Sequence, residues 1–134
     1  IVLDTNVISE IFRPSSEPRV IGWLVSLTGD VAITSITLAE LLASVRRLPD
    51  GRRKDELSHG IAEAVTLYRG SQSVLSFDAD AANDRGMLAS REAAGAPIST
   101  TDAQIAAICL AHGAVCATRT VKDFQHAGVK IVDP

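Results

Sequence analysis

The stretch Ile1-Val2-Leu3-Asp4-Thr5-Asn6 decides the fold class, because an apolar run gives way at once to three polar residues. This pattern predicts a short buried strand that ends at Asp4 and leads into a turn. Longer segments with apolar residues at helical spacing separate it from four more short apolar runs, at 30–34, 74–77, 115–117 and 129–132. The alternation predicts an α/β fold of three layers, with a parallel five-stranded sheet flanked by helices.

The helical segments have recognisable ends. Pro18 opens one helix, Ser35 or Thr37 can cap another, and Asp78 and Thr101 can cap two later ones. Gly113 supplies a left-handed stop. The predicted helices cover 8–12, 18–29, 35–48, 52–68, 78–94 and 103–111, with Gly95-Ala96-Pro97 as a breaker and Ile98 as a short extended link.

Length and composition fit one domain over residues 1–134, with 46% apolar and 22% charged residues. A mean hydropathy of +0.19 argues against disorder. The uncharged stretch 103–118 is too short and too polar for a bilayer span, and no secretory signal is recognisable. Cys109 and Cys116 lack metal-binding spacing. We therefore expect buried free thiols, no membrane association and a cytoplasmic location.

Four acids fall next to the predicted strands. Asp4 closes the first strand, Glu40 follows the second, and Asp102 and Asp123 flank the fourth. Ligands of open parallel sheets gather at the carboxyl ends of the strands, so these acids matter if the sheet brings them together. Carboxylates about 4 Å apart repel by roughly 4 kcal/mol at an effective dielectric near 20, so protons or cations must neutralise such a cluster. An all-oxygen set favours Mg²⁺ or Mn²⁺ over Zn²⁺, and such ions promote hydrolysis of phosphate esters.

Each acid also has a purely structural interpretation. Asp4 can form an Asx turn. Glu40 can complete a capping box with Thr37. Asp102 suits the first turn of a helix, and Asp123 can be a solvated loop acid.

Four segments in order carry a resemblance to a known family. They are Asp4-Thr5-Asn6-Val7-Ile8-Ser9-Glu10, Thr37-Leu38-Ala39-Glu40-Leu41, Asp102-Ala103-Gln104-Ile105-Ala106-Ala107 and Ala117-Thr118-Arg119-Thr120-Val121-Lys122-Asp123-Phe124. Together they resemble the PIN-domain ribonucleases, in particular the toxin subunits of the VapBC and FitAB toxin–antitoxin systems. The likeness spans nearly the whole chain.

The resemblance implies a PIN fold and a Mg²⁺- or Mn²⁺-dependent endoribonuclease that leaves a 5′-phosphate and a 3′-hydroxyl. It implies that Asp4, Glu40 and Asp102 form the catalytic, metal-binding core. Some members carry a fourth acid where this chain has Thr120, while others use the acid of an Asp-Phe pair, so the resemblance implies that Asp123, in Asp123-Phe124, is the fourth acid here. The supporting polar side chains are Asn6, Thr118 and Thr120.

The resemblance also implies partners: an RNA substrate and a cognate antitoxin that inserts into a groove beside the site, in a homodimer or a toxin–antitoxin hetero-oligomer. The segments 18–27 and 52–68 offer apolar faces for such contacts. The formal charge of −3 argues against a broad basic surface, but removing four site acids leaves +1. RNA contacts are expected from Arg46, Arg47, Arg52, Arg53 and Lys54, unless this charge run is only a solvated turn.

Two alternatives remain open at the level of sequence. An acidic pocket without catalysis could receive a basic peptide of a partner. A haloacid-dehalogenase-like phosphatase also places an aspartate after its first strand, but it requires a second acid where Asn6 stands. Covalent trapping of Asp4 would identify the phosphatase.

Overall fold

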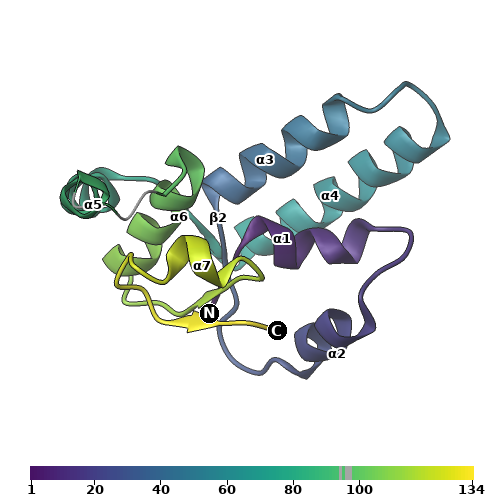
Figure 1. The fold of residues 1–134 in the computed structure, drawn as a ribbon. Helices are drawn as coiled ribbons and strands as arrows, with labels where there is room; N and C mark the ends of the chain where they lie inside the picture. Colours follow the sequence, from purple (N-terminus) through teal and green to yellow (C-terminus); the bar gives the residue numbers. More distant parts are fainter. Residues whose placement is uncertain (94, 96–97) are drawn as a thin grey trace.

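Five two-residue strands form the centre of the computed structural model, which describes residues 1–93, 95 and 98–134 (Figure 1). All pairings between these strands are parallel. One ladder has the order β1-β4-β5, the other joins β2 to β3, and a parallel bridge from Val2 to Ala32 links them. The order across the sheet is therefore β3-β2-β1-β4-β5, and the predicted parallel arrangement is confirmed. The strands are β1 (Val2–Leu3), β2 (Ile33–Thr34), β3 (Val74–Leu75), β4 (Cys116–Ala117) and β5 (Ile131–Val132).

Helices occupy most of the remaining chain and lie on both sides of the strands (Figure 1). Because adjacent strand residues point to opposite faces, Val2 and Leu3 belong to different apolar clusters, one with Ile105 of α6 and one with Leu41 of α3. This gives the three layers that the sequence predicts. The helical elements are α1 (Thr5–Ile8), the 3₁₀ turn η1 (Ser9–Phe12), α2 (Pro18–Ser26), α3 (Ser35–Arg46), α4 (Arg52–Gly70), α5 (Ala79–Ala93), α6 (Thr100–Ala111) and α7 (Val121–Phe124).

Helix starts agree with the sequence only in part. Asp78 caps α5 through the backbone N–H of Ala81, as predicted. The predicted caps of α3 and α6 are wrong, because the true caps are Thr34 and Ser99. Each lies in extended backbone directly before its helix, where its hydroxyl can accept from the first turn. Ala94 and the Ala96-Pro97 part of the predicted breaker lie outside the described residues.

The thiols of Cys109 and Cys116 are free and buried, as expected. Gly113 has a φ of +59° at the end of α6, which is the left-handed stop that the sequence predicts. Within the described ranges, none of the helices has both the length and the apolar character that a bilayer span requires.

Candidate active site

Three parallel strands end at the same edge of the sheet, and the polar residues that follow them define the candidate site. Asp4 follows β1, and its backbone N–H donates to the carbonyl of Ala117 at 2.9 Å, which aligns the ends of β1 and β4. Helix α3 leaves β2 at this edge and carries Glu40. The structure therefore gathers residues that are far apart in the sequence.

The four predicted acids are close enough for their charges to act on one another. Glu40 and Asp102 both raise the pKa of Asp4, and Asp123 and Glu40 both raise that of Asp102. Asp4 is 3% exposed, Glu40 and Asp102 are half-buried, and Asp123 is exposed. These four acids, from the buried carboxylate of Asp4 to the exposed one of Asp123, are called the acidic pocket below.

Asp4 forms the buried base of the pocket. Its Oδ1 accepts from the backbone N–H of Thr5 at 2.8 Å, and its Oδ2 accepts from the hydroxyl of Thr118 at 2.8 Å. Burial raises the pKa of Asp4 from 3.8 to about 6, the two hydrogen bonds oppose this, and the charges of Asp102 and Glu40 add to it. The predicted turn at 4–6 is wrong, since α1 begins at Thr5 with Asp4 as its cap.

Glu40 does not act as a helix cap. Because α3 begins at Ser35, Glu40 lies beyond the first turn, and the backbone N–H of Thr37 bonds to Thr34 instead. The hydroxyl of Thr5 donates to Glu40 Oε1 at 2.7 Å and lies 3.1 Å from the hydroxyl of Thr37. The capping-box interpretation is therefore wrong, and Glu40 is held toward the end of β1.

Asp102 and Asp123 come from two helices that pack on each other, α6 and α7. Burial raises the pKa of Asp102, the side chain of Ser99 opposes this, and the charges of Asp123 and Glu40 raise it further. Asp123 lies in α7 and not in a loop, so that part of its structural interpretation is wrong. Its side chain is exposed to solvent, as that interpretation expects.

The predicted supporting residues form a hydrogen-bonded layer beside Asp4. The hydroxyl of Thr118 lies 3.1 Å from that of Thr120 and accepts from the backbone N–H of Thr120 at 3.1 Å. The amide nitrogen of Asn6 donates to Thr120 Oγ1 at 3.3 Å, and Asn6 Oδ1 accepts from the backbone N–H of Arg119 at 3.1 Å. This layer ties α1 to the segment after β4 and fixes the direction of the Thr118 hydroxyl.

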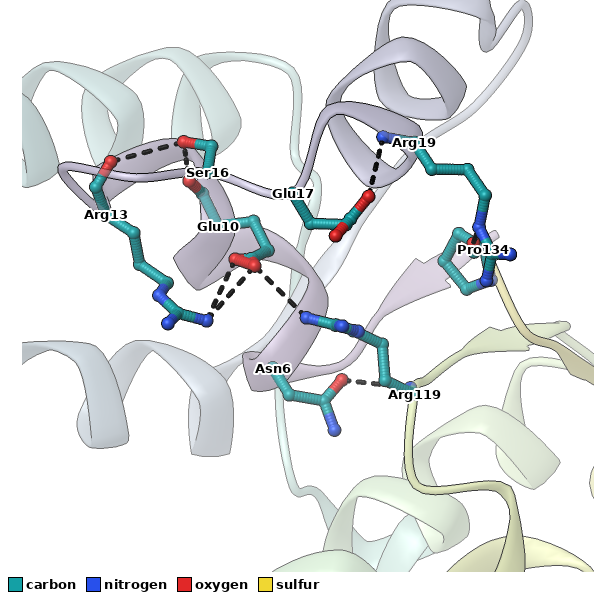
Figure 2. A network of polar contacts seen from close by, with 8 residues as sticks. All are labelled: Asn6, Glu10, Arg13, Ser16, Glu17, Arg19, Arg119 and Pro134. Atoms are coloured by element: carbon teal, nitrogen blue, oxygen red, sulfur yellow. Dashed lines mark hydrogen bonds and ion pairs between the residues drawn. The ribbon is translucent and has the colours of Figure 1, made fainter.

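Sequence reasoning missed two features next to the pocket. One is Thr5, the hydrogen-bond donor to Glu40. The other is Glu10, which is 1% exposed and lies between the guanidinium groups of Arg13 and Arg119 (Figure 2). A signal existed for Glu10, because it lies three residues after the buried Val7 and so on the apolar face of its helical turn.

The donor chemistry of the pocket fits a hard divalent cation. Carboxylates and hydroxyls supply the oxygen atoms, and the pKa of Asp4 is raised, first by burial and then by the charges of Asp102 and Glu40. Across the described part of the chain, no three His, Cys, Asp or Glu side chains converge enough to hold a metal ion as they stand. Carboxylates repel one another, so closure of such a site requires the positive charge of a cation.

The predicted RNA-contacting cations lie at the turn between α3 and α4. Lys54 donates to Asp50 and to the carbonyl of Arg46, and Arg52 pairs with Glu56, so these contacts are local to the α3–α4 turn. That turn projects away from α6 and α7 (Figure 1). Arg53 alone of this set lines a groove that also contains Thr5.

Comparison with known proteins agrees with this fold. Residues 1–129 match the family model of the PIN domain. The chain belongs to the PIN-domain family. The similarity of this PIN domain to other proteins covers its full length. It is 38% identical to the plasmid stability protein StbB of Pseudomonas syringae pv. tomato and 34% identical to the VapC ribonuclease Y4jK of Sinorhizobium fredii. Both alignments cover 100% of this chain, and they cover 97% and 96% of the two relatives.

Solved structures also match this PIN domain over nearly its full length. The crystal structure of FitAcB from Neisseria gonorrhoeae matches this PIN domain with a TM-score of 0.92 and 36% identity, over 99% of this chain and 96% of that one. VapBC2 from Rickettsia felis, bound to a promoter DNA fragment, matches with a TM-score of 0.77 and 22% identity, over 98% and 96%. The latter likeness supports the fold alone.

Proposed function

We propose that this PIN domain is a divalent-cation-dependent endoribonuclease and the toxin of a toxin–antitoxin pair, acting in the cytoplasm. The observation that carries the proposal is the buried carboxylate of Asp4, whose pKa two other carboxylates raise and which a hydroxyl and a backbone N–H hold. Full-length similarity to a protein named VapC ribonuclease and to one named toxin FitB supports it.

In this proposal, Asp4 and Asp102 hold the cation, and Glu40 and Asp123 reach it directly or through water. A bound Mg²⁺ or Mn²⁺ supplies activation of water and stabilisation of the charge that develops on the departing oxygen. The hydroxyl of Thr118 fixes one oxygen of Asp4, so the other lone pairs of this carboxylate stay directed toward the pocket. The hydroxyl of Thr5 orients Glu40 in the same way.

Exposure of Asp123 at the rim gives the substrate a route of approach. The base of the pocket is buried and its rim is open to solvent, so an RNA strand can pass across it with one phosphate above Asp4. The residues that follow β1 and β4 keep the pocket floor rigid through the Asn6–Thr118–Thr120 layer. We propose in-line attack of water on the phosphorus of that phosphate, with cleavage of the bond to the 3′ oxygen, so that the products carry a 5′-phosphate and a 3′-hydroxyl.

The proposed antitoxin fits a groove beside the pocket. The groove has a volume of about 300 Å³ and lies between η1, α3 and α4, with Leu41, Val45 and Leu57 among its walls. Arg13 and Arg53 also line it. Apolar walls with two cations at the rim suit an amphipathic segment of a partner. The apolar faces of α2 and α4 remain our hypothesis for the larger contact, which a complex that buries neither helix would refute.

The decisive experiment incubates the purified chain with defined RNAs, with Mg²⁺, with Mn²⁺ and with EDTA, and maps both ends of each product. We expect internal cleavage with either metal, a 5′-phosphate on the downstream fragment and no cleavage in EDTA. Cleavage that persists in EDTA would refute the metal dependence. Intact RNA under every condition would instead favour an acidic pocket that only binds a basic peptide.

Growth provides an independent measure of the toxin role. Expression of the wild-type chain in a bacterium should arrest growth, whereas Asp102→Asn at equal expression should not. Asp30→Asn serves as a matched control, because Asp30 is exposed and precedes β2, at the opposite edge of the sheet. Arrest by the Asp102 variant would show that growth inhibition does not depend on the acidic pocket.

A further inference from the structure

Glu10 is a buried charge that the proposed mechanism does not use. Among the described residues, Asp4 and Glu10 are the two buried acidic side chains. Unlike Asp4, Glu10 lies between two arginines that reach it from two sides (Figure 2). Arg13 Nη1 lies 3.2 and 3.3 Å from its two carboxylate oxygens, and Arg119 Nη1 lies 3.1 Å from Oε1.

The trio of Glu10, Arg13 and Arg119 carries more positive charge than is needed to neutralise the buried carboxylate of Glu10. One arginine would neutralise the carboxylate, so the second leaves a net charge of +1. The side chains of Arg13 and Arg119 are 60% and 39% exposed. Each contacts Glu10 through Nη1, which leaves Nε and Nη2 of both guanidinium groups to bind an anion from solvent.

The trio is fixed to the acidic pocket through the backbone. The backbone N–H of Arg119 donates to Asn6 Oδ1, two residues after Asp4. The residue before Arg119 is Thr118, whose hydroxyl bonds to Asp4. Arg13 lines the same groove as Thr5, the donor to Glu40. The two guanidinium groups therefore meet at Glu10 in η1, the element that directly follows α1 and Asp4.

Charge balance indicates what they bind. Four carboxylates with one divalent cation still carry a charge of −2, which repels the phosphates of RNA. A planar guanidinium group matches a phosphate with paired hydrogen bonds. Resting on the ribonuclease activity proposed above, we infer that Arg13 and Arg119 bind an RNA phosphate beside the one that is cleaved, and that Glu10 is a positioning residue that holds both guanidinium groups.

The first test measures binding without cleavage. In an Asp102→Asn background with Mg²⁺, fluorescence polarisation follows a fluorescein-labelled single-stranded RNA of mixed sequence. Arg119→Gln and Arg13→Gln should each weaken binding by about tenfold. Each should also reduce the magnitude of the negative slope of log K against log salt by about 0.7. Arg69→Gln is the matched control, because Arg69 is exposed, lies in the last turn of α4 and lines a groove that contains neither Arg13 nor Arg119.

Three results would overturn the inference. Unchanged affinity and slope in the Arg13 and Arg119 variants would leave the trio as a structural ion pair only. An equal loss in the Arg69 control would show a general effect of charge. Reduced affinity for a purified antitoxin, with RNA affinity intact, would assign this surface to the protein partner instead.

The second test separates positioning from charge through the kinetics of RNA cleavage. Arg119→Gln should raise KM with kcat nearly unchanged, and Arg119→Lys should restore part of the loss. Glu10→Gln should also raise KM although it removes a negative charge, because the guanidinium groups lose their anchor. A lower KM for Glu10→Gln would refute the positioning role. If the wild type cleaves no RNA, the proposed function fails, while the binding test still decides whether the arginines hold RNA.

Discussion

Asp4 and Glu10 are two buried carboxylates on one short stretch of chain, and their surroundings differ in kind. Glu10 accepts from two guanidinium groups, so its negative charge is neutralised within the protein. Asp4 accepts from a hydroxyl and a backbone N–H, and its charged neighbours are other acids, which raise its pKa. Burial alone therefore does not define a site. A buried charge whose charged neighbours have the same sign indicates a ligand site. A buried charge that neighbouring groups neutralise indicates a structural or positioning role.

The largest expected effect removes one acid of the pocket. Asp102→Asn should lower the rate of RNA cleavage by about 100- to 10,000-fold, because the cation loses a ligand while the fold keeps an isosteric side chain. The Asp30→Asn protein should cleave at the wild-type rate. The measurement is the initial rate on a defined RNA, with circular dichroism to verify folding. A fully active Asp102 variant would contradict the assignment of the pocket.

The pH dependence of stability tests the surroundings of Asp4. The pKa of Asp4 is about 6 in the folded chain and 3.8 as an ordinary carboxyl, so the folded state binds more protons between these values. The free energy of unfolding should therefore fall as pH rises through this window, by about 3 kcal/mol. Asp4→Asn should remove that fall when unfolding by urea is measured across pH.

At neutral pH, Glu10→Gln and Asp4→Asn should change the free energy of unfolding in opposite directions. Asp4→Asn is expected to be more stable than the wild type at pH 7, whereas Glu10→Gln should lose about 1–3 kcal/mol because two guanidinium groups lose their charged partner. Destabilisation of similar size in both variants would refute the contrast between the two surroundings.

Addition of a cation should sharpen the contrast. Mg²⁺ or Mn²⁺ should raise the melting temperature of the wild type by several degrees, since a ligand at 100 times its Kd adds about 2.7 kcal/mol. The response should be lost in Asp4→Asn and retained in Glu10→Gln. Differential scanning fluorimetry with a titration of each metal makes the measurement, and an equal response in both variants would place the cation elsewhere.

The smallest expected effect tests a donor beside the pocket. Thr5→Val keeps the shape of the side chain but removes the hydroxyl that orients Glu40, and it should reduce cleavage by about tenfold. Thr66→Val is the matched control, because the Thr66 hydroxyl donates to the carbonyl of Ala62 on the exposed side of α4. Equal rates for the two variants would show that Glu40 needs no orienting hydroxyl.

The start of α3 is a feature that the sequence pattern leaves undecided. Thr34, Ser35 and Thr37 are all possible caps of α3, and local sequence does not distinguish among them. The sheet does, because pairing of β2 with β3 holds Thr34 in extended backbone with its hydroxyl toward Thr37. That choice moves Glu40 out of the first turn and makes its carboxylate available to Thr5.

The alternation of apolar strands and amphipathic helices determined the parallel α/β fold, because burial of both faces of a sheet imposes that pattern on local sequence. The positions of Asp4, Glu40, Asp102 and Asp123 after or between strands were equally visible. Only the tertiary structure decided that the charge of Asp4 lies near other acids and that the charge of Glu10 is neutralised by arginines. Proximity of Asp4 to Thr118, and of Glu10 to Arg119, depends on the pairing of β1 with β4, which joins segments more than 100 residues apart.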